Sequence, residues 1–471
     1  MRNLPERLAP HHPRSQLLAP LYSHLLANPA RHAIGRRLLQ DRLLDLTIRM
    51  ARDHTDYYGA SVPKRKDRWN YENLIELPPI SRLEAFRHNR ELIARITTFG
   101  FVTFTSGSTH QPPLLIERSL EEQQYIQNFF TCIQGPLFPK CTNLLAPLGL
   151  AEGFLDHGSV LRAPAFGYSF IVDLANNAGQ VRAAWLLQQS FNIARFESRI
   201  SSIQGSFHSL YYLCHFLDEE NIQLPPGQLK SIVCFGAPVP LHSRRNMEAL
   251  LGIPVHDNYS LAEVFGGARY CHDCNAYHFD PFLVEEVLDL QTGKRIDEGS
   301  GELILTPLFP FCQRFVLLRY RTADLVETFR TECPQGNRAY RFRGRLQHAV
   351  ASCQSGPLLG EAEVANAIEG IPEINRADCC LTLLSDSTFI EPPRFEMRQI
   401  PNQEGISLSI ELRWDPRSRL RELNNLSRQV RQAVLRGVPS DVAAWFRRKS
   451  TRFRIEFLPP KSLRDREYWK L

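Results

Sequence analysis

Two short clusters of side chains have types and spacing that could do chemistry, and the first lies near residue 105. Thr105, Ser106, Gly107, Ser108 and Thr109 follow the apolar run Phe101–Phe104. Glycine allows a tight turn, and hydroxyls with free backbone amides can converge on one anion. The cluster predicts a phosphate-binding loop, with a Ser/Thr-rich surface turn as the alternative. It is not a Walker A loop, because the GxxxxGK[ST] spacing is absent.

The second cluster is "RYCHDCNAYHFD", which contains Cys271, Cys274 and His278. A CxxC pair followed four residues later by histidine has the ligand types and spacing of a zinc site, and Cys333 is a candidate fourth ligand. We expect a closed structural site, with His272 as the spare ligand. Reduced thiols in a loop are the alternative.

The elements that must position these clusters change in character along the chain. Residues 1–95 carry a helical pattern. Within them "LPPISRLEAFRHN" predicts a turn and then a helix, with Ser81 as N-cap and Glu84 three residues later. From about residue 100, β-branched runs such as "SIVCFGAP" and "GELILTPL" alternate with helical segments such as "SLYYLCHFLDEE". This alternation predicts mostly parallel sheets flanked by helices.

The pattern changes again near "RFRGRLQHAV". The later segments "EAEVANAIEG", "ISLSIELRW" and "TRFRIEFLP" predict a small α+β unit, with "EPPRFEMRQIPNQEG" as a loop inside it. The fold class is therefore α/β. We expect a large N-terminal domain at 1–345, including the helical segment 1–95, and a small C-terminal α+β domain at 346–471.

Several ordered segments resemble the adenylate-forming enzymes, the acyl-CoA synthetase superfamily, and most closely its phenylacetate–CoA ligase branch. "TSGST" followed by a proline resembles the phosphate loop of that family. The other matching segments, in family order over residues 75–350, are "LPPISRLEAFR", "LKSIVCFGAPVP", "LGIPVHDNYSLAEVFG", "FDPFLVEEVLDLQTGKRIDEGSGELILTPL", "LLRYRTADLVETF" and "RFRGRLQHAV".

The resemblance implies an AMP-forming acid–thiol ligase that uses ATP and magnesium. A carboxylic acid, aryl or arylacetic in this branch, would attack the α-phosphate, and a thiol such as coenzyme A would take the acyl group from AMP. Transfer to an amine or a carrier protein is one alternative. A nucleotide-binding pseudoenzyme, or a subunit that binds a partner's acyl group, is the alternative of another class.

The resemblance also implies roles for individual residues. Tyr259 would stack on adenine, Asp324 would accept hydrogen bonds from the ribose, and Arg345 would approach the ribose or phosphates. Glu263 would hold magnesium, which prefers carboxylates and phosphate oxygens. The full nucleotide-site set implied is Thr105, Ser106, Gly107, Ser108, Thr109, Gly236, Ala237, Pro238, Asn258, Tyr259, Ser260, Asp324 and Arg345.

The chain departs from the family pattern at several places. His110-Gln111 stands where the family usually has Gly-Lys, and the missing charge could be supplied by His110 or Arg118, or not at all. The acid of the family's adenine-side "GAEP" turn is also missing, since Ala237 precedes Pro238. Gln347-His348 stands where the hinge usually has an acid. The family's C-terminal lysine bridges the carboxylate and the α-phosphate, and here Lys470 in "LRDREYWKL" is the candidate, with a frayed end that has no role as the alternative. The catalytic candidates are therefore Lys470, Glu263 and His110.

Composition limits the classes of protein that remain. Hydrophobic residues make up 43% and charged residues 23%, as in globular proteins, and the formal net charge is +6. We expect no nucleic-acid partner, no membrane span and no signal peptide, and hence a cytoplasmic protein with reduced thiols. The arginines of "RSRLRELNNLSRQVRQAVLRG" predict a solvated helix face, with a surface for coenzyme A phosphates or an acyl-carrier protein as the alternative. A homodimer stays open.

Overall fold

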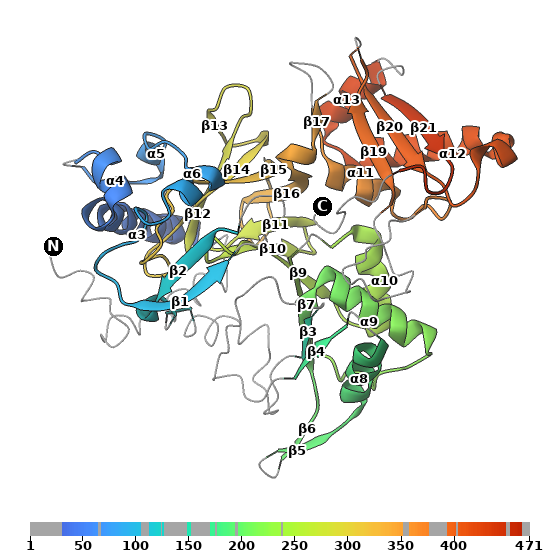
Figure 1. Cartoon of the computed structure of the whole chain (residues 1–471), viewed down its shortest axis with the longest axis horizontal. Helices are drawn as coiled ribbons and strands as arrows, with labels where there is room; N and C mark the ends of the chain where they lie inside the picture. Colours follow the sequence, from blue (N-terminus) through green and yellow to red (C-terminus); the bar gives the residue numbers. More distant parts are fainter. Residues whose placement is uncertain are drawn as a thin grey trace.

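The computed structural model describes most of the chain as one α/β structure. The described residues are 31–64, 67–104, 113–123, 125–126, 148–151, 170–174, 177–193, 196–236, 239–351, 358–375, 393–401, 404–448 and 453–463. Figure 1 shows the helical N-terminal region in blue, a long sheet through the middle and a smaller C-terminal group of elements in orange and red. No helix among these residues is both long enough and apolar enough to span a bilayer.

The described part of the N-terminal region is helical, as predicted. It contains α3 (Ala33–His54), α4 (Asp56–Ser61), α5 (Tyr71–Leu74) and α6 (Arg82–Arg87). The predicted cap of α6 is confirmed: the Ser81 hydroxyl accepts from the Glu84 backbone N–H, and the Glu84 side chain accepts from the Ser81 backbone N–H. The strand β1 (Phe99–Phe104) then pairs antiparallel with β2 (Leu115–Ser119).

Within the large sheet, parallel pairing is confined to one end. There the strand order is β9 (Val255–Ser260), β8 (Ser231–Phe235), β7 (Ser202–Ser206), β3 (Leu148–Ala151) and β4 (Ile171–Asp173). Helices α8 (Asn177–Gln188), α9 (Phe207–Glu219) and α10 (Leu241–Leu251) lie on one side of these strands (Figure 1). A separate hairpin is formed by β5 (Phe191–Ile193) and β6 (Phe196–Ser198).

The rest of the large sheet is antiparallel, which corrects the expectation that parallel pairing dominates. From β9 the order continues through β10 (Gly267–Cys271), β11 (Ala276–Phe279), β16 (Arg338–Arg345), β15 (Tyr320–Arg330), β14 (Gly299–Pro307), β12 (Leu283–Leu288) and β13 (Arg295–Ile296). Short turns, rather than crossover helices, join most of these strands, and a short turn permits only antiparallel neighbours. The α/β fold class itself is confirmed.

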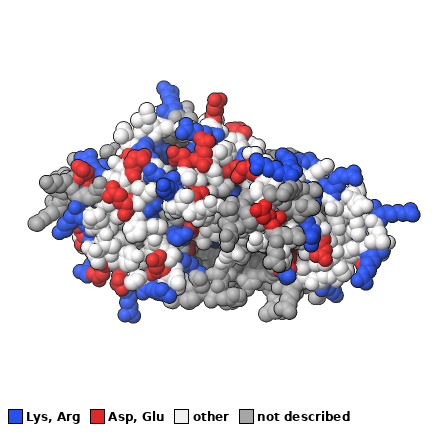
Figure 2. All heavy atoms as spheres, turned by 90° about the horizontal axis from the view of Figure 1, so that it is seen from above, with Lys and Arg blue, Asp and Glu red and all other residues white. Residues whose placement is uncertain are grey.

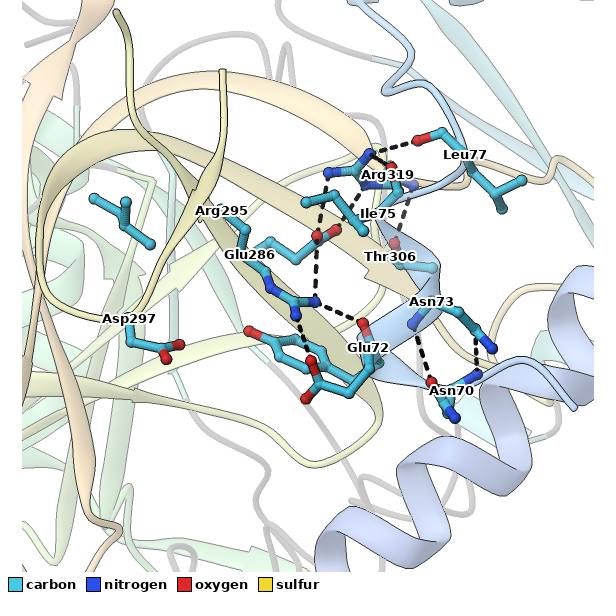
Figure 3. Close-up of polar contacts among 12 residues, drawn as sticks. Asn70, Glu72, Asn73, Ile75, Leu77, Glu286, Arg295, Asp297, Thr306 and Arg319 are labelled. Atoms are coloured by element: carbon cyan, nitrogen blue, oxygen red, sulfur yellow. Dashed lines mark hydrogen bonds and ion pairs between the residues drawn. The ribbon is translucent and has the colours of Figure 1, made fainter. Parts of the chain in front are cut away.

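A buried arginine fastens the N-terminal region to the start of β15. The Arg319 guanidinium forms a two-pronged ion pair with Glu286, at 2.9 and 3.1 Å, and donates to the carbonyls of Ile75 and Leu77. Its backbone N–H donates to Thr306 Oγ1 at 3.0 Å. Figure 3 shows these contacts converging from the segment after α5 and from two strands. Because Arg319 directly precedes β15, the contacts fix where that strand begins.

A second arginine strengthens the same junction. Arg295 on β13 donates to the Tyr71 carbonyl at 2.6 Å and pairs with Glu72 at 2.7 Å (Figure 3). Its guanidinium also lies over the Tyr71 ring, 3.9 Å from the centroid. Asn70 and Asn73 cap the short helix α5 reciprocally. The helical region is thus held by specific polar contacts as well as by the shared core.

The C-terminal residues form a smaller α+β group with its own core. Its helices are α11 (Glu361–Ile368), α12 (Leu420–Gly437) and α13 (Ser440–Arg448), with the short turns η3 (Leu346–His348) and η4 (Pro416–Arg419). Its strands are β17 (Val350–Ala351), β18 (Leu358–Leu359), β19 (Phe395–Gln399), β20 (Ile406–Glu411) and β21 (Phe453–Leu458). The buried side chains of Val364, Phe395, Leu408, Val430 and Phe453 belong to one cluster. The division at residue 345 stays a prediction.

One element of this group was predicted wrongly. The segment expected to be a loop contains the strand β19, which pairs antiparallel with β20. Phe395 and Met397 alternate with polar residues and are buried, which is the period-two pattern of a strand. The prolines just before Phe395 and the short length of the run concealed that pattern.

Candidate functional site

The candidate site is built around Asp324 on β15, whose carboxylate accepts from side chains on two other strands of the sheet, β9 and β16. Asp324 lies on β15 and is 6% exposed. Its Oδ2 accepts a 2.6 Å hydrogen bond from the Tyr259 hydroxyl on β9, and its Oδ1 lies 3.1 Å from Nη1 of Arg345 at the end of β16. The same arginine nitrogen donates to the Thr322 carbonyl at 3.0 Å. Three residues that the sequence assigned to one nucleotide site are therefore in direct contact.

Local backbone geometry explains why Asp324 and Arg345 meet. They are direct partners in the antiparallel register of β15 and β16. Ala323 has φ of +59° and Gly344 has φ of +113°, so both strands turn through the left-handed region beside the pair. A Cβ on Gly344 would come within 3.2 Å of the Ala362 backbone nitrogen on α11. Glycine at this position permits close approach of the C-terminal group to the site.

Two contacts fix the side chain of Tyr259, one at a face of its ring and one at its hydroxyl. Its ring stacks on Phe342, with centroids 4.1 Å apart and planes at 25°. Burial and the neighbouring Asp324 carboxylate raise the pKa of Tyr259 well above its usual value, so the phenol stays a proton donor. Since Phe342 covers one ring face, an adenine could stack only on the opposite face.

Glu263 lies after β9 and makes a contact with β15. Its Oε1 accepts a 2.8 Å hydrogen bond from the Tyr320 hydroxyl. Burial and the adjacent Glu263 raise the pKa of Tyr320, so this phenol also remains a donor. A half-buried carboxylate oriented by one hydrogen bond suits Mg²⁺, which commonly takes one or two carboxylates together with phosphate oxygens.

Arg118 is not free to replace the missing lysine of the phosphate loop, which corrects one of the two sequence suggestions. Its guanidinium pairs with buried Glu122 at 2.7 Å and donates to the Ala262 carbonyl at 3.1 Å. Glu122 also accepts from the backbone N–H groups of Gln313 and Arg314. Arg118 therefore supports the segment that carries Glu263. No sequence motif indicated its hydrogen bond to Ala262, which lies 144 positions away.

The remaining described residues of the predicted nucleotide site lie at the ends of β8 and β9. Gly236 has φ of +89°, a conformation that side chains resist. Phe235 and Asn258 are register partners in the parallel pair, so Gly236 and Asn258 lie at the same sheet edge. Ser260 is exposed and pairs with Gly267 on β10. A Cβ on Gly267 would come within 1.9 Å of the Tyr259 carbonyl oxygen, so this strand crossing requires glycine.

The predicted metal cluster is assembled by two hairpin turns. Cys271, Cys274 and His278 belong to the β10–β11 hairpin, and Cys333 comes from the turn between β15 and β16. Their ligand atoms all lie within 4.8 Å of one another. Cys271 Sγ is 3.6 Å from Cys333 Sγ, and Cys274 Sγ is 3.2 Å from His278 Nε2. A tetrahedral zinc with sulfur at about 2.3 Å requires sulfur atoms roughly 3.8 Å apart, so the donor set fits that ion.

The electrostatics of the cluster agree with a closed site. Burial and the neighbouring Cys271 raise the pKa of the Cys274 thiol to about 12, and burial raises that of Cys333. Such thiols bind a metal only by losing their protons to it. His272, the spare ligand, contacts the rings of His256 and Tyr270 instead. His278, rather than His272, is therefore the histidine of the candidate metal site.

Some predicted site residues lie outside the described part of the chain. They are Thr105, Ser106, Gly107, Ser108, Thr109, His110, Ala237, Pro238 and Lys470. Their assignments stay predictions.

The arginine-rich helix α12 has one buried apolar face. Leu426, Val430 and Val434 are buried, whereas Leu420 is 67% exposed and does not belong to that face. The arginines of α12 and α13 that are exposed are Arg421, Arg428, Arg436, Arg447 and Arg448. Figure 2 shows basic side chains over this end of the molecule, at the right of the view. Exposure of this kind agrees with a solvated face.

Comparisons with known proteins agree with the fold. Neither a protein-family model nor a curated protein matches the sequence. Among solved structures, an open conformation of 2-hydroxyisobutyryl-CoA ligase in complex with 2-HIB-AMP and CoA has a TM-score of 0.65 at 15% identity, over 93% of this chain and 90% of that chain. ATP-bound MatB from Rhodopseudomonas palustris has a TM-score of 0.50 at 14% identity, over 78% of this chain and 65% of that chain.

A second state of the same ligase is less similar. In its thioesterification state, with 2-HIB-AMP and CoA, the TM-score falls to 0.53 at 16% identity, over 92% of this chain and 88% of that chain. At such identities the likeness shows the fold, which is that of adenylate-forming ligases with a smaller C-terminal domain.

Proposed function

We propose that the protein uses ATP to activate a carboxylic acid as an acyl-adenylate and then transfers the acyl group to a thiol such as coenzyme A. The observation that carries the proposal is the convergence of Tyr259, Asp324 and Arg345 from three strands of an adenylate-forming ligase fold. These residues supply an aromatic face, a carboxylate acceptor and a fixed cation. Those are the groups needed to bind adenine, a ribose diol and phosphate.

Asp324 would bind the ribose through the acceptor positions of its carboxylate that Tyr259 and Arg345 leave open. A ribose diol offers two hydroxyl donors, and a buried carboxylate accepts from several donors at once. Arg345 holds the carboxylate in place and contributes positive charge close to the ribose. Charge-assisted hydrogen bonds of this kind are roughly twice as strong as neutral ones. The pair would therefore fix the nucleoside while its phosphates extend toward the predicted loop Thr105–Thr109.

The chemistry requires little covalent work from the protein. A carboxylate oxygen of the acid forms a bond to the α-phosphorus, and the bond from that phosphorus to pyrophosphate breaks. Holding two anions together and neutralising charge on the phosphorus supplies the catalysis. Magnesium, when bound, would neutralise phosphate charge, and Glu263 would hold it. Lys470 and His110 are the proposed cationic partners of the reacting groups.

The second half-reaction releases AMP. The sulfur of the thiol attacks the acyl carbon, and the bond from that carbon to the adenylate oxygen breaks. The similar structure of 2-hydroxyisobutyryl-CoA ligase is in complex with 2-HIB-AMP and CoA, which supports a thiol acceptor here. An aryl or arylacetic acid is the proposed substrate class, and a carrier protein or an amine is the alternative acceptor.

Carboxylate-dependent ATP–pyrophosphate exchange tests the proposal. The purified full chain is incubated with ATP, magnesium, labelled pyrophosphate and a panel of aryl, arylacetic and short aliphatic acids. We expect label to enter ATP only when a suitable acid is present. Nucleotide binding without exchange for any acid would favour a pseudoenzyme, and exchange followed by transfer only to amines would replace the thiol as acceptor.

A further inference from the structure

Val239 is the first described residue after the predicted adenine-binding turn, and both its backbone N–H and its carbonyl are hydrogen-bonded to buried side chains. Its N–H donates to Asp257 Oδ2 at 2.9 Å, and its carbonyl accepts from Arg244 at 3.4 Å. Arg244 and Asp257 pair with each other at 3.1 Å, and both are buried. Gly236, on the other side of the turn, follows β8 directly. Two side chains therefore fix one end of the turn.

The same two side chains contact the hairpin that carries the cysteine–histidine cluster. The Tyr277 hydroxyl donates to Asp257 Oδ2 at 2.5 Å. The Arg244 guanidinium lies over the Tyr270 ring, 3.6 Å from its centroid. Tyr270 and Tyr277 face each other across β10 and β11, with ring centroids 5.4 Å apart. Each tyrosine immediately precedes a predicted metal ligand in the sequence.

In the described part of the chain, Asp257 connects the hairpin to the turn through side-chain hydrogen bonds, in addition to the backbone pairing of β10 with β9. One oxygen, Oδ2, accepts from Val239, Arg244 and Tyr277. The next two residues of β9 are Asn258 and Tyr259, both assigned to the nucleotide site. A movement of the hairpin that displaced Tyr277 would therefore act on Asp257, and through it on both borders of the adenine position.

We propose that Asp257 is a positioning residue that links the hairpin of Cys271, Cys274 and His278 to the adenine-binding turn, so that metal-dependent ordering of the hairpin tightens ATP binding. The inference rests on the proposed function, because it concerns the nucleotide site assigned there. A structural metal would bind the hairpin to Cys333, whose Sγ lies 3.6 Å from Cys271 Sγ, and would thereby hold Tyr277, the residue before His278, in place. The metal would then act on affinity for ATP without touching the nucleotide.

The test compares Tyr277→Phe with Tyr340→Phe in the full metal-bound chain. Both changes remove one hydroxyl from a buried tyrosine in adjacent strands, but the Tyr340 hydroxyl contacts Glu285 at 3.3 Å and lies outside the network. Binding of a non-hydrolysable ATP analogue is measured by titration calorimetry. We expect Tyr277→Phe to weaken binding about five- to tenfold, because a hydrogen bond to a charged group is lost and part of its free energy acts on the nucleotide site through Asp257, while Tyr340→Phe stays within about twofold.

Kinetics separate positioning from general destabilisation. The KM for ATP should rise in Tyr277→Phe by the same factor as the dissociation constant, and the KM for the carboxylic acid should stay unchanged. A loss shared equally by both substrates, or an equal loss in Tyr340→Phe, would overturn the inference. Asp257→Asn is the second variant: it keeps the size of the side chain and should weaken ATP binding at least as much as Tyr277→Phe.

Removal of the metal is the third experiment. Chelation should weaken binding of the ATP analogue in the wild type, and the further loss in Tyr277→Phe should be smaller, because linked changes are not additive. Full additivity would overturn the link. If the wild type binds no nucleotide at all, both the proposed function and the inference fail. If it binds nucleotide and Tyr277→Phe binds equally well, the inference alone fails.

Discussion

The hydroxyl of Tyr259 donates a hydrogen bond to the carboxylate of Asp324, at 2.6 Å and across 65 positions of sequence. The bond connects the end of the parallel part of the sheet to its antiparallel part. Arg345 holds the other carboxylate oxygen at 3.1 Å. An acceptor that is already oriented by a phenol and a guanidinium is preorganised for a ligand that brings further donors. This arrangement is the centre of the proposed nucleotide site.

Asp324→Asn should weaken ATP binding strongly. The amide cannot accept at both oxygen positions, and hydrogen bonds to charged groups are worth about 1.5–3 kcal/mol, which corresponds to a KM for ATP raised roughly ten- to hundredfold. Steady-state kinetics at varied ATP measure this. Asp297→Asn is the control, because that carboxylate is exposed and pairs with Arg338. An unchanged KM in Asp324→Asn would remove Asp324 from the nucleotide site.

The purified protein should contain one zinc ion per chain, bound at the cysteine–histidine cluster. Cys271→Ser should abolish the bound zinc and lower the melting temperature, because metal binding contributes folding free energy. Cys214→Ser is the matched control, since Cys214 is also a buried free cysteine but lies outside the cluster. Metal analysis by mass spectrometry decides. Zinc content that is equal in both variants would contradict the assignment.

The C-terminal group should depend on a buried ion pair for its attachment. Arg343 on β16 pairs with Glu363 on α11 at 2.6 and 3.1 Å, and both side chains are buried. Glu363→Gln leaves the buried guanidinium without its counter-charge, which costs about 3–5 kcal/mol. Denaturant unfolding measures the loss. Glu298→Gln, which breaks an exposed pair with Arg330, should change stability by less than about 0.5 kcal/mol.

The cap of α6 predicts a small pH dependence of stability. The Ser81 side chain, followed by the Ser81 backbone N–H, lowers the pKa of Glu84 below its ordinary value of 4.5. The contribution of the Glu84 carboxylate is therefore present above about pH 4.5 and is lost as the pH falls through the lower, folded pKa. Glu84→Gln should be slightly less stable than the wild type at pH 7, and the difference should shrink as the pH falls below about 4.5. A constant difference across this pH range would contradict the cap as its source.

Local signals in the sequence predicted much of the fold. The Ser81–Glu84 cap, the strands at Ser231–Phe235 and Gly299–Pro307 and the solvated face of α12 follow from residue types and spacing within short windows. The strand β19 was missed because its pattern is short and follows two prolines. The antiparallel half of the sheet was missed because strand direction depends on which connections are hairpins.

Some residues of the candidate site were predicted from the sequence, and others were not. The cysteine–histidine spacing placed the cluster, and the structure brings all four predicted ligands together. The partners of Asp324 followed from family resemblance rather than from local pattern. Arg118–Glu122 and Asp257–Arg244 had no sequence signal, because each side chain is an ordinary charge until the fold buries it beside its partner.

The most direct test follows one oxygen atom. The carboxylic acid that supports pyrophosphate exchange is prepared with both carboxylate oxygens as oxygen-18 and is incubated with ATP, magnesium, coenzyme A and the wild-type chain. Attack of the carboxylate on the α-phosphorus, followed by thiol attack on the acyl carbon, leaves one labelled oxygen in AMP. Mass spectrometry should therefore find AMP that carries a single label. Unlabelled AMP, or ADP together with labelled phosphate, would contradict an acyl-adenylate and with it the central claim.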